Sequence, residues 1–315
     1  MKIVNAGYTM VDIPDVLKKI EYAGRICYKS EDKITEDSAK TFCTNIIKRG
    51  HEAVLEHASF CFKTNFRTFS DLVRRNRILS HAGFNSFLHM TYCDHYLVSG
   101  NVRAWRDFFK AHMNYYQQLP AYFYDFIFKN PILFPEFQDE EIFDTMDGDL
   151  LLINTKTLTD ATEIAIHHYE TVHFVCDRGV SHEIVRHRPA SYCQESTRYC
   201  NYSKNKFGNE ITVIKPCFWA EDSEQYMVWK DSMQATETAY FKLLDLNATP
   251  QEARSVLPTE LKTEIVMTAN MGEWRHFLNL RTSDAAHPQI REVAQPLLRT
   301  LKLNYPLFFN TEVTK

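Results

Sequence analysis

Glycine is scarce in this sequence. Only nine of the 315 residues are glycine, and none of them forms the patterns GxGxxG or GxxxxGK[ST]. These two glycine loops allow a backbone to approach a phosphate group closely. Their absence argues against a Rossmann dinucleotide site and against a P-loop, so an anion that this protein prefers must be held in another way.

Long apolar runs and paired cysteines are also lacking. No stretch reaches the roughly 18 apolar residues that a membrane span needs, and the first 15 residues hold no run suited to a signal peptide. We therefore expect a cytoplasmic protein without a membrane partner. The eight cysteines form no CxxC pair, which favours free thiols in a reducing compartment. The net charge of −4 argues against bulk affinity for nucleic acid.

Aromatic residues are abundant. The chain has 22 Phe and 16 Tyr, and 44% of its residues are apolar. This composition excludes a disordered chain and provides for a substantial core. We predict a single domain, residues 1–315, of the α+β class, with helices packed on a mixed or antiparallel sheet. Residues from about 65 to 170 are predicted to form an inserted, mostly helical subdomain.

Helix boundaries are well marked at three places. Thr249-Pro250-Gln251-Glu252 has a capping box with proline at the first helical position, and Asn270 with Glu273 is a looser version of the same signal. A third predicted helix, DRGVSHEIVRHR, should be ended by Pro189, since a proline disfavours helical geometry in the residue before it. Residues 186–188 would then lie at the helix exit.

Two arginines have unusual predicted positions. Trp274, Phe277, Leu278 and Arg281 follow helical spacing, so that Arg281 projects from an apolar stripe. A buried guanidinium needs an anion or several acceptors. An internal salt bridge, or extension of the side chain past the helix end, is the alternative to ligand binding and is favoured on this evidence alone. Arg254 is predicted early in a helix, where the dipole favours an anion rather than a cation.

The densest polar segment runs from Arg186 to Tyr199, with the sequence R-H-R-P-A-S-Y-C-Q-E-S-T-R-Y. Its three arginines, its serine and threonine hydroxyls and its two acid or amide side chains suit a phosphate and a base edge. A solvated polar loop is the plain alternative. Interleaved Val185, Tyr192 and Tyr199 favour a binding cleft, because clefts combine apolar surface with a few polar groups.

This segment resembles the substrate loop of flavin-dependent thymidylate synthases, whose signature is RHR followed after seven residues by serine, here Arg186 to Ser196. Four other segments resemble that family in the same order: AGRICY, GHEAVLEHASFCF, ARSVLP, and NMGEWRHFLNLR followed by AHPQ. The resemblance spans most of the chain outside the predicted insertion. It implies a fold like that of the thymidylate synthase complementing protein.

The resemblance also implies an activity, namely FAD-dependent methylation of dUMP to dTMP with methylenetetrahydrofolate as one-carbon donor and NADPH as reductant. It implies a homotetramer with active sites shared between subunits, and no metal. The residues that would bind FAD are His57, Arg186, His187, Arg188, Gln194, Asn270, Gly272, His276 and His287. The residues that would bind dUMP are Glu183, Ile184, Val185, Arg186, Gln194, Glu195, Ser196, Thr197, Arg198, Arg254 and Arg281.

Arg281 would be the catalytic residue, stabilising negative charge on the uracil ring. Ser196 is assigned to the ligand phosphate, because the local spacing places no general base against its hydroxyl. The sequence departs from many relatives at Cys193-Gln194, at Gly272, where some have arginine, and at Cys27.

These departures leave two alternatives. One is a non-catalytic homologue that binds nucleotide or flavin. The other is an RNA-binding protein that would use the arginines of the aromatic insertion, although charged runs on helices are more often solvated faces. These arginines are Arg74, Arg75, Arg77, Arg103 and Arg106.

Two pairs of segments are faintly similar to each other. N-V-R-A-W-R-D-F-F from Asn101 resembles N-M-G-E-W-R-H-F-L from Asn270, and R-T-F-S-D-L-V-R-R-N-R from Arg67 resembles R-G-V-S-H-E-I-V-R-H-R from Arg178. Helix-start chemistry common to both explains much of the match. The sequence alone does not establish a duplication, and no prediction rests on it.

Overall fold

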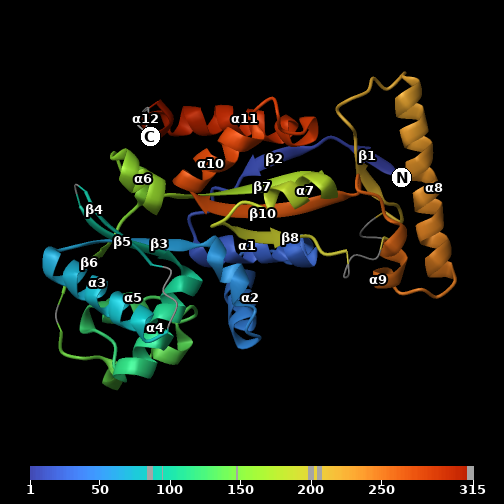
Figure 1. Cartoon of the computed structure of the whole chain (residues 1–315). Coiled ribbons are helices and arrows are strands. Elements are labelled where there is room, and N and C mark those ends of the chain that lie inside the picture. Colours follow the sequence, from blue (N-terminus) through green and yellow to red (C-terminus); the bar gives the residue numbers. More distant parts are fainter. Residues whose placement is uncertain (84–87, 94, 147, 198–201, 204–207, 311–315) are drawn as a thin grey trace.

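The computed structural model describes residues 1–83, 88–93, 95–146, 148–197, 202–203 and 208–310. Two four-stranded antiparallel sheets and a parallel pair of strands carry the helices, which confirms the predicted α+β class (Figure 1). No helix of the described part is long and apolar enough to cross a membrane.

The main sheet has the strand order β2 (Gly7–Met10), β7 (Tyr169–Asp177), β10 (Lys262–Asn270), β8 (Ser191–Gln194). Successive side chains of a strand point to opposite faces. Accordingly, Ile265 and Met267 join the core under α10 (Met271–Arg281) and α11 (Pro288–Asn304), whereas Val266 joins the core beside α1 (Val16–Tyr28). The helices therefore cover both faces of this sheet (Figure 1).

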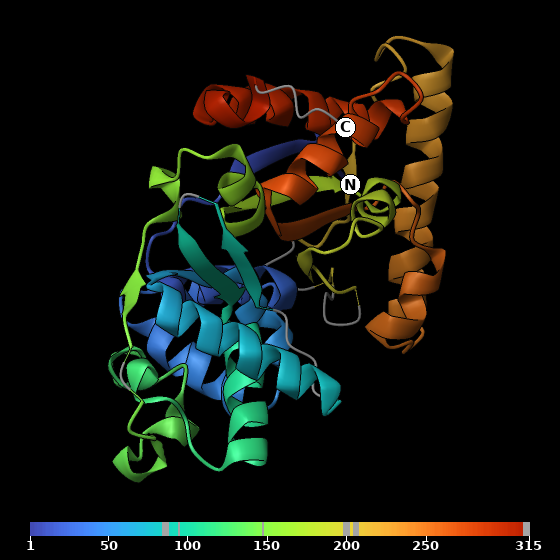
Figure 2. The ribbon, with the colours of Figure 1, turned by 60° about the vertical axis from the view of Figure 1, so that its left-hand side comes forward.

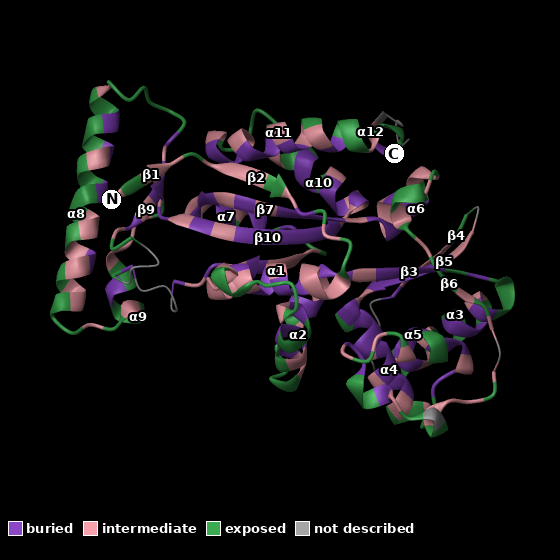
Figure 3. Cartoon of the chain, turned by 180° about the vertical axis from the view of Figure 1, so that it is seen from behind, coloured by how far each residue is buried: buried purple, intermediate pink, exposed green. Residues whose placement is uncertain are grey.

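The second sheet has the order β4 (His89–Tyr92), β5 (Tyr96–Asn101), β3 (Ser59–Thr64), β6 (Leu150–Leu152). It packs with α3 (Phe66–His81), α4 (Val102–Tyr116) and α5 (Tyr124–Phe128) around buried aromatic side chains. The segment from 65 to 170 thus contains β4, β5, β6 and the start of β7 besides its helices, and the boundaries of an inserted subdomain stay a prediction. Much of the aromatic content predicted to form a core lies in this part, and the strands β3, β7 and β10 are largely buried (Figure 3).

The remaining elements extend these two layers. β1 (Lys2–Val4) pairs with β9 (Thr212–Ile214), next to α8 (Glu224–Asp245) and α9 (Pro250–Ala253), at the end of the molecule far from α3 and α4 (Figures 1 and 2). The other helices are α2 (Ser38–Lys48), α6 (Ala161–His167), α7 (Arg178–Ile184) and α12 (Pro306–Asn310). Short 3-10 turns cover Glu31–Lys33, Glu52–His57, Ala121–Phe123, Pro135–Phe137, Glu140–Ile142, Thr155–Thr157 and Arg254–Val256.

The two four-stranded sheets are built from a common unit. We call β3, α3, β4, β5 and α4 the first unit, and β7, α7, β8, β10 and α10 the second unit. In each unit the last strand pairs with the other two, ends at an asparagine and leads directly into a helix. Asn101 pairs with Ser59 and Asn270 with Tyr169, and in both cases the partner is the first residue of the unit's first strand.

The register of the middle strand agrees as well. His89, the first residue of β4, pairs with Ser99, and Ser191, the first residue of β8, pairs with Thr268. Both partners lie two residues before the capping asparagine. The helices that follow bury the same side chains, Trp105 and Phe108 in α4 and Trp274 and Phe277 in α10. The faint similarity in the sequence therefore corresponds to a structural repeat.

The two units contact each other reciprocally. His57, two residues before β3, pairs through Nδ1 with Thr268 Oγ1 of the second unit at 2.8 Å. His167, two residues before β7, pairs through Nδ1 with Ser99 Oγ of the first unit at 2.7 Å. In each unit, the histidine that precedes the first strand thus makes the same contact with the last strand of the other unit, as in a two-fold symmetric dimer. Here both halves of the interface belong to one chain.

Candidate functional site

A cavity of about 850 Å³ lies between the two units. Its volume falls in the range of small-molecule and cofactor sites. The first unit contributes His89, Asn101, Arg103 and Asp107 to its wall, and the second unit contributes Val185, Arg188, Ser191 and Asn270. Three residues predicted to bind ligands, Val185, Arg188 and Asn270, are therefore brought together here.

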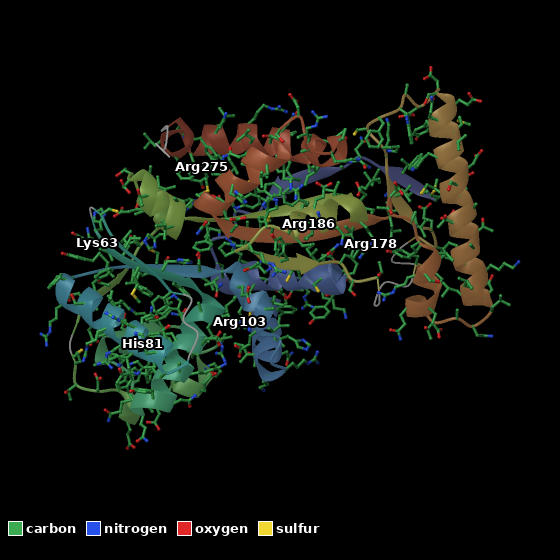
Figure 4. All side chains as sticks on the ribbon, viewed as in Figure 1. Lys63, His81, Arg103, Arg178, Arg186 and Arg275 are labelled. Carbon is green, nitrogen blue, oxygen red and sulfur yellow. The ribbon has the colours of Figure 1, made fainter. Side chains whose placement is uncertain are left out.

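Glu56 ties the two walls of this cavity together. Arg103 Nη1 lies 2.7 Å from Glu56 Oε1, and Ser191 Oγ donates to Glu56 Oε2 at 2.9 Å. Arg103 Nε is also 3.6 Å from Asp107 Oδ2. A carboxylate in the 3-10 turn before β3 thus joins α4 of the first unit to β8 of the second, and Figure 4 labels Arg103 on α4.

The arginine-rich loop begins earlier than predicted. α7 ends at Ile184, so Arg186, His187 and Arg188 follow the helix instead of forming its last turn. The Tyr192 hydroxyl donates to the carbonyl oxygens of Ile184 and His187, at 3.0 and 2.6 Å. These bonds satisfy carbonyls at the helix end. Arg186, labelled in Figure 4, and Arg188 are exposed, whereas His187 and Ile184 are buried.

Arg281 projects from the last turn of α10 toward this loop. Its Nη1 donates to Glu183 Oε2 at 2.6 Å, its Nη2 to the Glu183 carbonyl at 3.1 Å and its Nε to His187 Nε2 at 2.9 Å. The internal salt bridge considered from the sequence is therefore present. Three hydrogen bonds of this geometry fix the plane of the guanidinium at the edge of the apolar stripe.

His187 is held as the neutral imidazole. Burial, Arg281 and His276 lower the pKa of His187 to about 4. Because Nε2 accepts from Arg281, Nδ1 carries the proton of the neutral ring. Burial raises the pKa of Glu273, whose Oε1 lies 3.6 Å from His187 Nδ1. Neither atom has a hydrogen-bond partner within the described part of the chain.

His187, Glu273 and His276 could together hold a metal ion, since their ligand atoms lie within 4.8 Å of one another. The sequence analysis did not identify this group. Glu273 and His276 are one helical turn apart on α10, which is the signal that could have identified it. The expected absence of a metal stays a prediction.

The other residues predicted to bind dUMP contact partners other than Arg281. Gln194 Nε2 donates to Ser181 Oγ at 2.9 Å, Glu195 is buried 3.1 Å from Lys262 Nζ, and Arg254 Nη1 donates to Thr197 Oγ1 at 3.3 Å. Ser196 between them is partly buried. Arg198 lies outside the described residues.

The predicted position of Arg254 early in a helix is wrong. The capping box at Thr249 is confirmed, but α9 ends at Ala253 and Arg254 opens the following 3-10 turn. Pro258 shortly afterwards disfavours continuation of the helix. Arg254 therefore lies at the C-terminal end of α9, where the helix dipole favours a cation.

Seven of the nine predicted cofactor residues do not line the cavity, namely His57, Arg186, His187, Gln194, Gly272, His276 and His287. His57 is fully buried, and burial, with a smaller effect of Lys19, lowers its pKa to about 3. It contacts Thr268, which does line the cavity. His287 is exposed at the N-cap of α11 with its ring against Phe218. Gly272 lies in the first turn of α10, where an added Cβ would be 3.2 Å from the Ala165 carbonyl oxygen.

The departures at Cys193 and at the insertion also have structural consequences. Cys193 is buried in β8, and burial raises the pKa of its thiol. Asn101 and Arg103 line the cavity although the sequence prediction omitted them as site residues. Their signal was the faint similarity between the segments that start at Asn101 and Asn270.

Comparison with known proteins identifies one family. The model of the family described as thymidylate synthase complementing protein matches residues 9–87 and 152–307. The unmatched residues 88–151 contain β4, β5, α4, α5 and the first two residues of β6. The match therefore covers most of the chain.

Individual relatives agree with the family match. The flavin-dependent thymidylate synthase of Pyrococcus furiosus is 36% identical over 126 residues, 40% of this chain and 51% of that protein. That of Geobacter sulfurreducens is 36% identical over 132 residues, 42% of this chain and 55% of its own length. That of Corynebacterium aurimucosum is 32% identical over 148 residues, with 42% and 57% covered. The chain thus spans about half the length of the curated relatives it matches.

Proposed function

The chain belongs to the thymidylate synthase complementing protein family, and on this premise we propose that it is a flavin-dependent thymidylate synthase. It would convert dUMP to dTMP in the cytoplasm, with methylenetetrahydrofolate as one-carbon donor and NADPH as reductant. The observation that carries the proposal is the fixed guanidinium of Arg281, which Glu183 and His187 orient beside the arginine-rich loop.

The cavity between the two units suits FAD. Arg188 offers donors for phosphate, Asn270 offers an amide for the edge of a ring, and Pro189 and Ala190 offer apolar contact. The buried atoms of His187 and Glu273 that have no hydrogen-bond partner among the described residues are further candidates for polar contacts. When bound, the flavin supplies the redox chemistry of the reaction. The predicted FAD residues His57, Arg186, Gln194, Gly272, His276 and His287 remain part of this proposal.

Arg281 would act on the pyrimidine. Its charge is permanent, and its hydrogen bonds to Glu183 and His187 orient it before the reaction begins. A preorganised cation of this kind stabilises negative charge that develops on the uracil ring, at no cost of reorganisation in the transition state. His187, as a neutral acceptor, keeps the guanidinium in place without adding a competing charge.

The dUMP phosphate would be held by the residues around Thr197 and Arg254. Thr197 and Arg254 already share a hydrogen bond, and a hydroxyl beside a guanidinium is a favourable pair for phosphate. Ser196 and Arg198 complete this proposed group. Arg281 contacts Glu183 and His187, and Arg254 contacts Thr197. In line with the family resemblance, we propose that sites are shared between subunits of a homotetramer.

Of the two alternatives, the RNA-binding one loses two of the five arginines that it would use. Arg75 and Arg106 are buried and paired with carboxylates, Arg75 with Asp71 and Arg106 with Glu52 and Glu136, so they are not available to an RNA backbone. The non-catalytic homologue is tested by the same experiment as the proposed activity.

That experiment is the visible spectrum of the purified protein, followed by NADPH oxidation with and without dUMP. We expect flavin absorption, NADPH oxidation that responds to dUMP, and dTMP formation only when methylenetetrahydrofolate is added. A colourless protein that takes up no added FAD would contradict the proposal and favour the non-catalytic homologue.

A further inference from the structure

The structural repeat gives a residue-by-residue correspondence at the cavity. Asn101-Val102-Arg103 in the first unit corresponds to Asn270-Met271-Gly272 in the second. The two asparagines cap their helices in the same way, accepting from Ala104 N at 2.8 Å and from Glu273 N at 2.9 Å. Both asparagines line the same cavity, so the first turns of α4 and α10 meet it from opposite sides.

The third residue of these two three-residue segments differs between the units. Arg103 lines the cavity, whereas Gly272 has no side chain, and the Ala165 carbonyl of α6 leaves little room for one. A cation at this position of the repeat therefore comes from the first unit. Arg188, which comes from the second unit, lines the same cavity.

The environment of Arg103 allows it to bind an anion. Its side chain is 44% exposed and is paired with Glu56 and Asp107, which are 25% and 32% exposed. Ion pairs as exposed as these contribute little stability, so the guanidinium can turn toward a ligand at small cost. Glu56 keeps the hydrogen bond from Ser191 when Arg103 turns.

We propose that Arg103 binds the phosphate groups of the flavin cofactor, from the wall opposite Arg188. Guanidinium groups match phosphate with two parallel hydrogen bonds, and two of them on facing walls suit a pyrophosphate. The choice of ligand rests on the proposed function. The first unit is then part of the cofactor site, and residues 88–151, outside the family match, supply a residue that binds the cofactor.

The test compares ligands with and without phosphate. Arg103→Met keeps the length of the side chain and removes its charge, and Arg103→Lys keeps a charge without the planar fork. Arg77→Met, at an exposed position of α3 outside this cavity, removes the same charge as a control. Dissociation constants of FAD and riboflavin are measured by flavin fluorescence on stripped protein, and that of dUMP on the flavin-loaded protein.

We expect Arg103→Met to weaken FAD binding by about 10- to 100-fold, as for loss of a hydrogen bond to a charged group, with riboflavin and dUMP affinities unchanged. Arg103→Lys should fall between this variant and the wild type, and Arg77→Met should match the wild type. Unchanged FAD affinity in Arg103→Met would overturn the proposal. An equal loss for FAD and riboflavin would also overturn it, because it would indicate a structural role.

Failure of the proposed function is recognised separately. If the wild-type protein bound no flavin, the thymidylate synthase assignment would fail. Binding of inorganic pyrophosphate would then be measured by calorimetric titration instead. Pyrophosphate binding that is lost in Arg103→Met but kept in Arg77→Met would support an anion site at Arg103. No pyrophosphate binding to the wild type would overturn that site.

Discussion

The two units of the repeat place a carboxylate, an arginine and a histidine at equivalent positions, but they use them differently. Positions are counted from the residue that caps each helix. In both units the carboxylate is six positions after the cap of the first helix, α3 or α7. The residue ten positions after that cap pairs with the residue eleven positions after the cap of the second helix, α4 or α10. The first triad is Asp71, Arg75 and His112, and the second triad is Glu183, His187 and Arg281. The arginine and the histidine have exchanged places between the units.

The first triad is closed. Arg75 Nε donates to Asp71 at 2.6 Å, and its Nη1 donates to His112 Nε2 at 2.8 Å. The Tyr122 hydroxyl donates to Asp71 at 2.9 Å, and Asp144 pairs with Arg75 at 3.3 Å. Burial and Arg75 lower the pKa of His112 to about 4. All three triad members are buried, so this network serves the stability of the first unit.

The second triad is open because its first helix is short. α3 continues to His81, whereas α7 ends at Ile184, so that His187 lies in a loop and Arg281 at a partly exposed edge. The same set of charges is therefore buried where the helix continues and partly exposed where the helix stops early. The length of the first helix, rather than the identity of the triad residues, distinguishes the closed triad from the open one.

The comparison predicts its largest effect for Arg75. Arg75→Met should lower the free energy of unfolding by about 3 to 5 kcal/mol, because it leaves the buried carboxylate of Asp71 without its main partner. Urea unfolding measures this loss. Arg74→Met is the matched control, since Arg74 also pairs with Asp71 but is 62% exposed, and it should cost less than about 1 kcal/mol. Equal losses in the two variants would show that the first triad is not closed.

Arg281→Ala should affect turnover instead. We expect kcat to fall by about 10²- to 10³-fold, the cost of losing one preorganised contact to developing charge, while the protein folds and retains flavin. NADPH oxidation at saturating dUMP gives kcat, and the visible spectrum gives the flavin content. Near-normal turnover would remove Arg281 from the mechanism and make the two triads alike.

The sequence predicted the local features of this site well. The capping box at Thr249, the cap at Asn270 and the apolar stripe that carries Arg281 depend on neighbours within one helix, and the structure confirms them. Arg281 was expected to have either an internal salt bridge or a ligand, and it has the salt bridge to Glu183. The error at Arg254 came from the length of a helix, which Pro258 shortens.

Features that depend on strand pairing were not predictable. Arg103 and Arg188 line one cavity only because β5 and β10 have the same register in two separate sheets. A single sequence gives no such register, and the similarity between the segments at Asn101 and Asn270 was too short to establish it. The roles assigned by resemblance to Ser196, His276 and the other ligand residues stay predictions.

The reciprocal contacts between the units predict a matched pair of pH effects. Burial, with a smaller effect of Lys19 or His89, lowers the pKa of His57 to about 3 and that of His167 to about 4, below the unfolded value of 6.5. Between the folded and the unfolded pKa, each histidine is protonated in the unfolded chain but not in the folded protein. The free energy of unfolding therefore falls as the pH drops below 6.5. Each histidine accounts for about 1.4 kcal/mol at pH 5.5.

His57→Gln and His167→Gln should each flatten this pH dependence by about one proton, as measured by urea unfolding between pH 7.5 and 4.5. The flattening should extend to lower pH for His57, whose folded pKa is the lower one. Comparison with the wild type at pH 7.5 separates the packing cost of each substitution. If the pH dependence of stability changed in only one of the two variants, the contacts of His57 and His167 would not be equivalent.

The smallest expected effect concerns the caps of α3 and α7. Asn65 accepts from Thr68 N at 2.8 Å, and Asp177 accepts from Val180 N at 2.7 Å, so the two caps are equivalent. Asn65 is exposed and also donates to Asp149, whereas Asp177 is buried and its pKa is raised by burial and by Glu260. A charge in the second cap therefore costs stability at neutral pH, and that cost disappears below the unfolded pKa of aspartate.

Exchanging the caps should accordingly give opposite signs. Asparagine and aspartate cap helices about equally well, so Asp177→Asn should stabilise the protein slightly at pH 7, and Asn65→Asp, which places a carboxylate beside Asp149, should destabilise it slightly, each by less than about 1 kcal/mol. Thermal unfolding at pH 7 and pH 4 measures both, and the gain from Asp177→Asn should shrink at pH 4. A loss of stability in Asp177→Asn would mean that the ionised carboxylate stabilises the start of α7 by more than its burial costs.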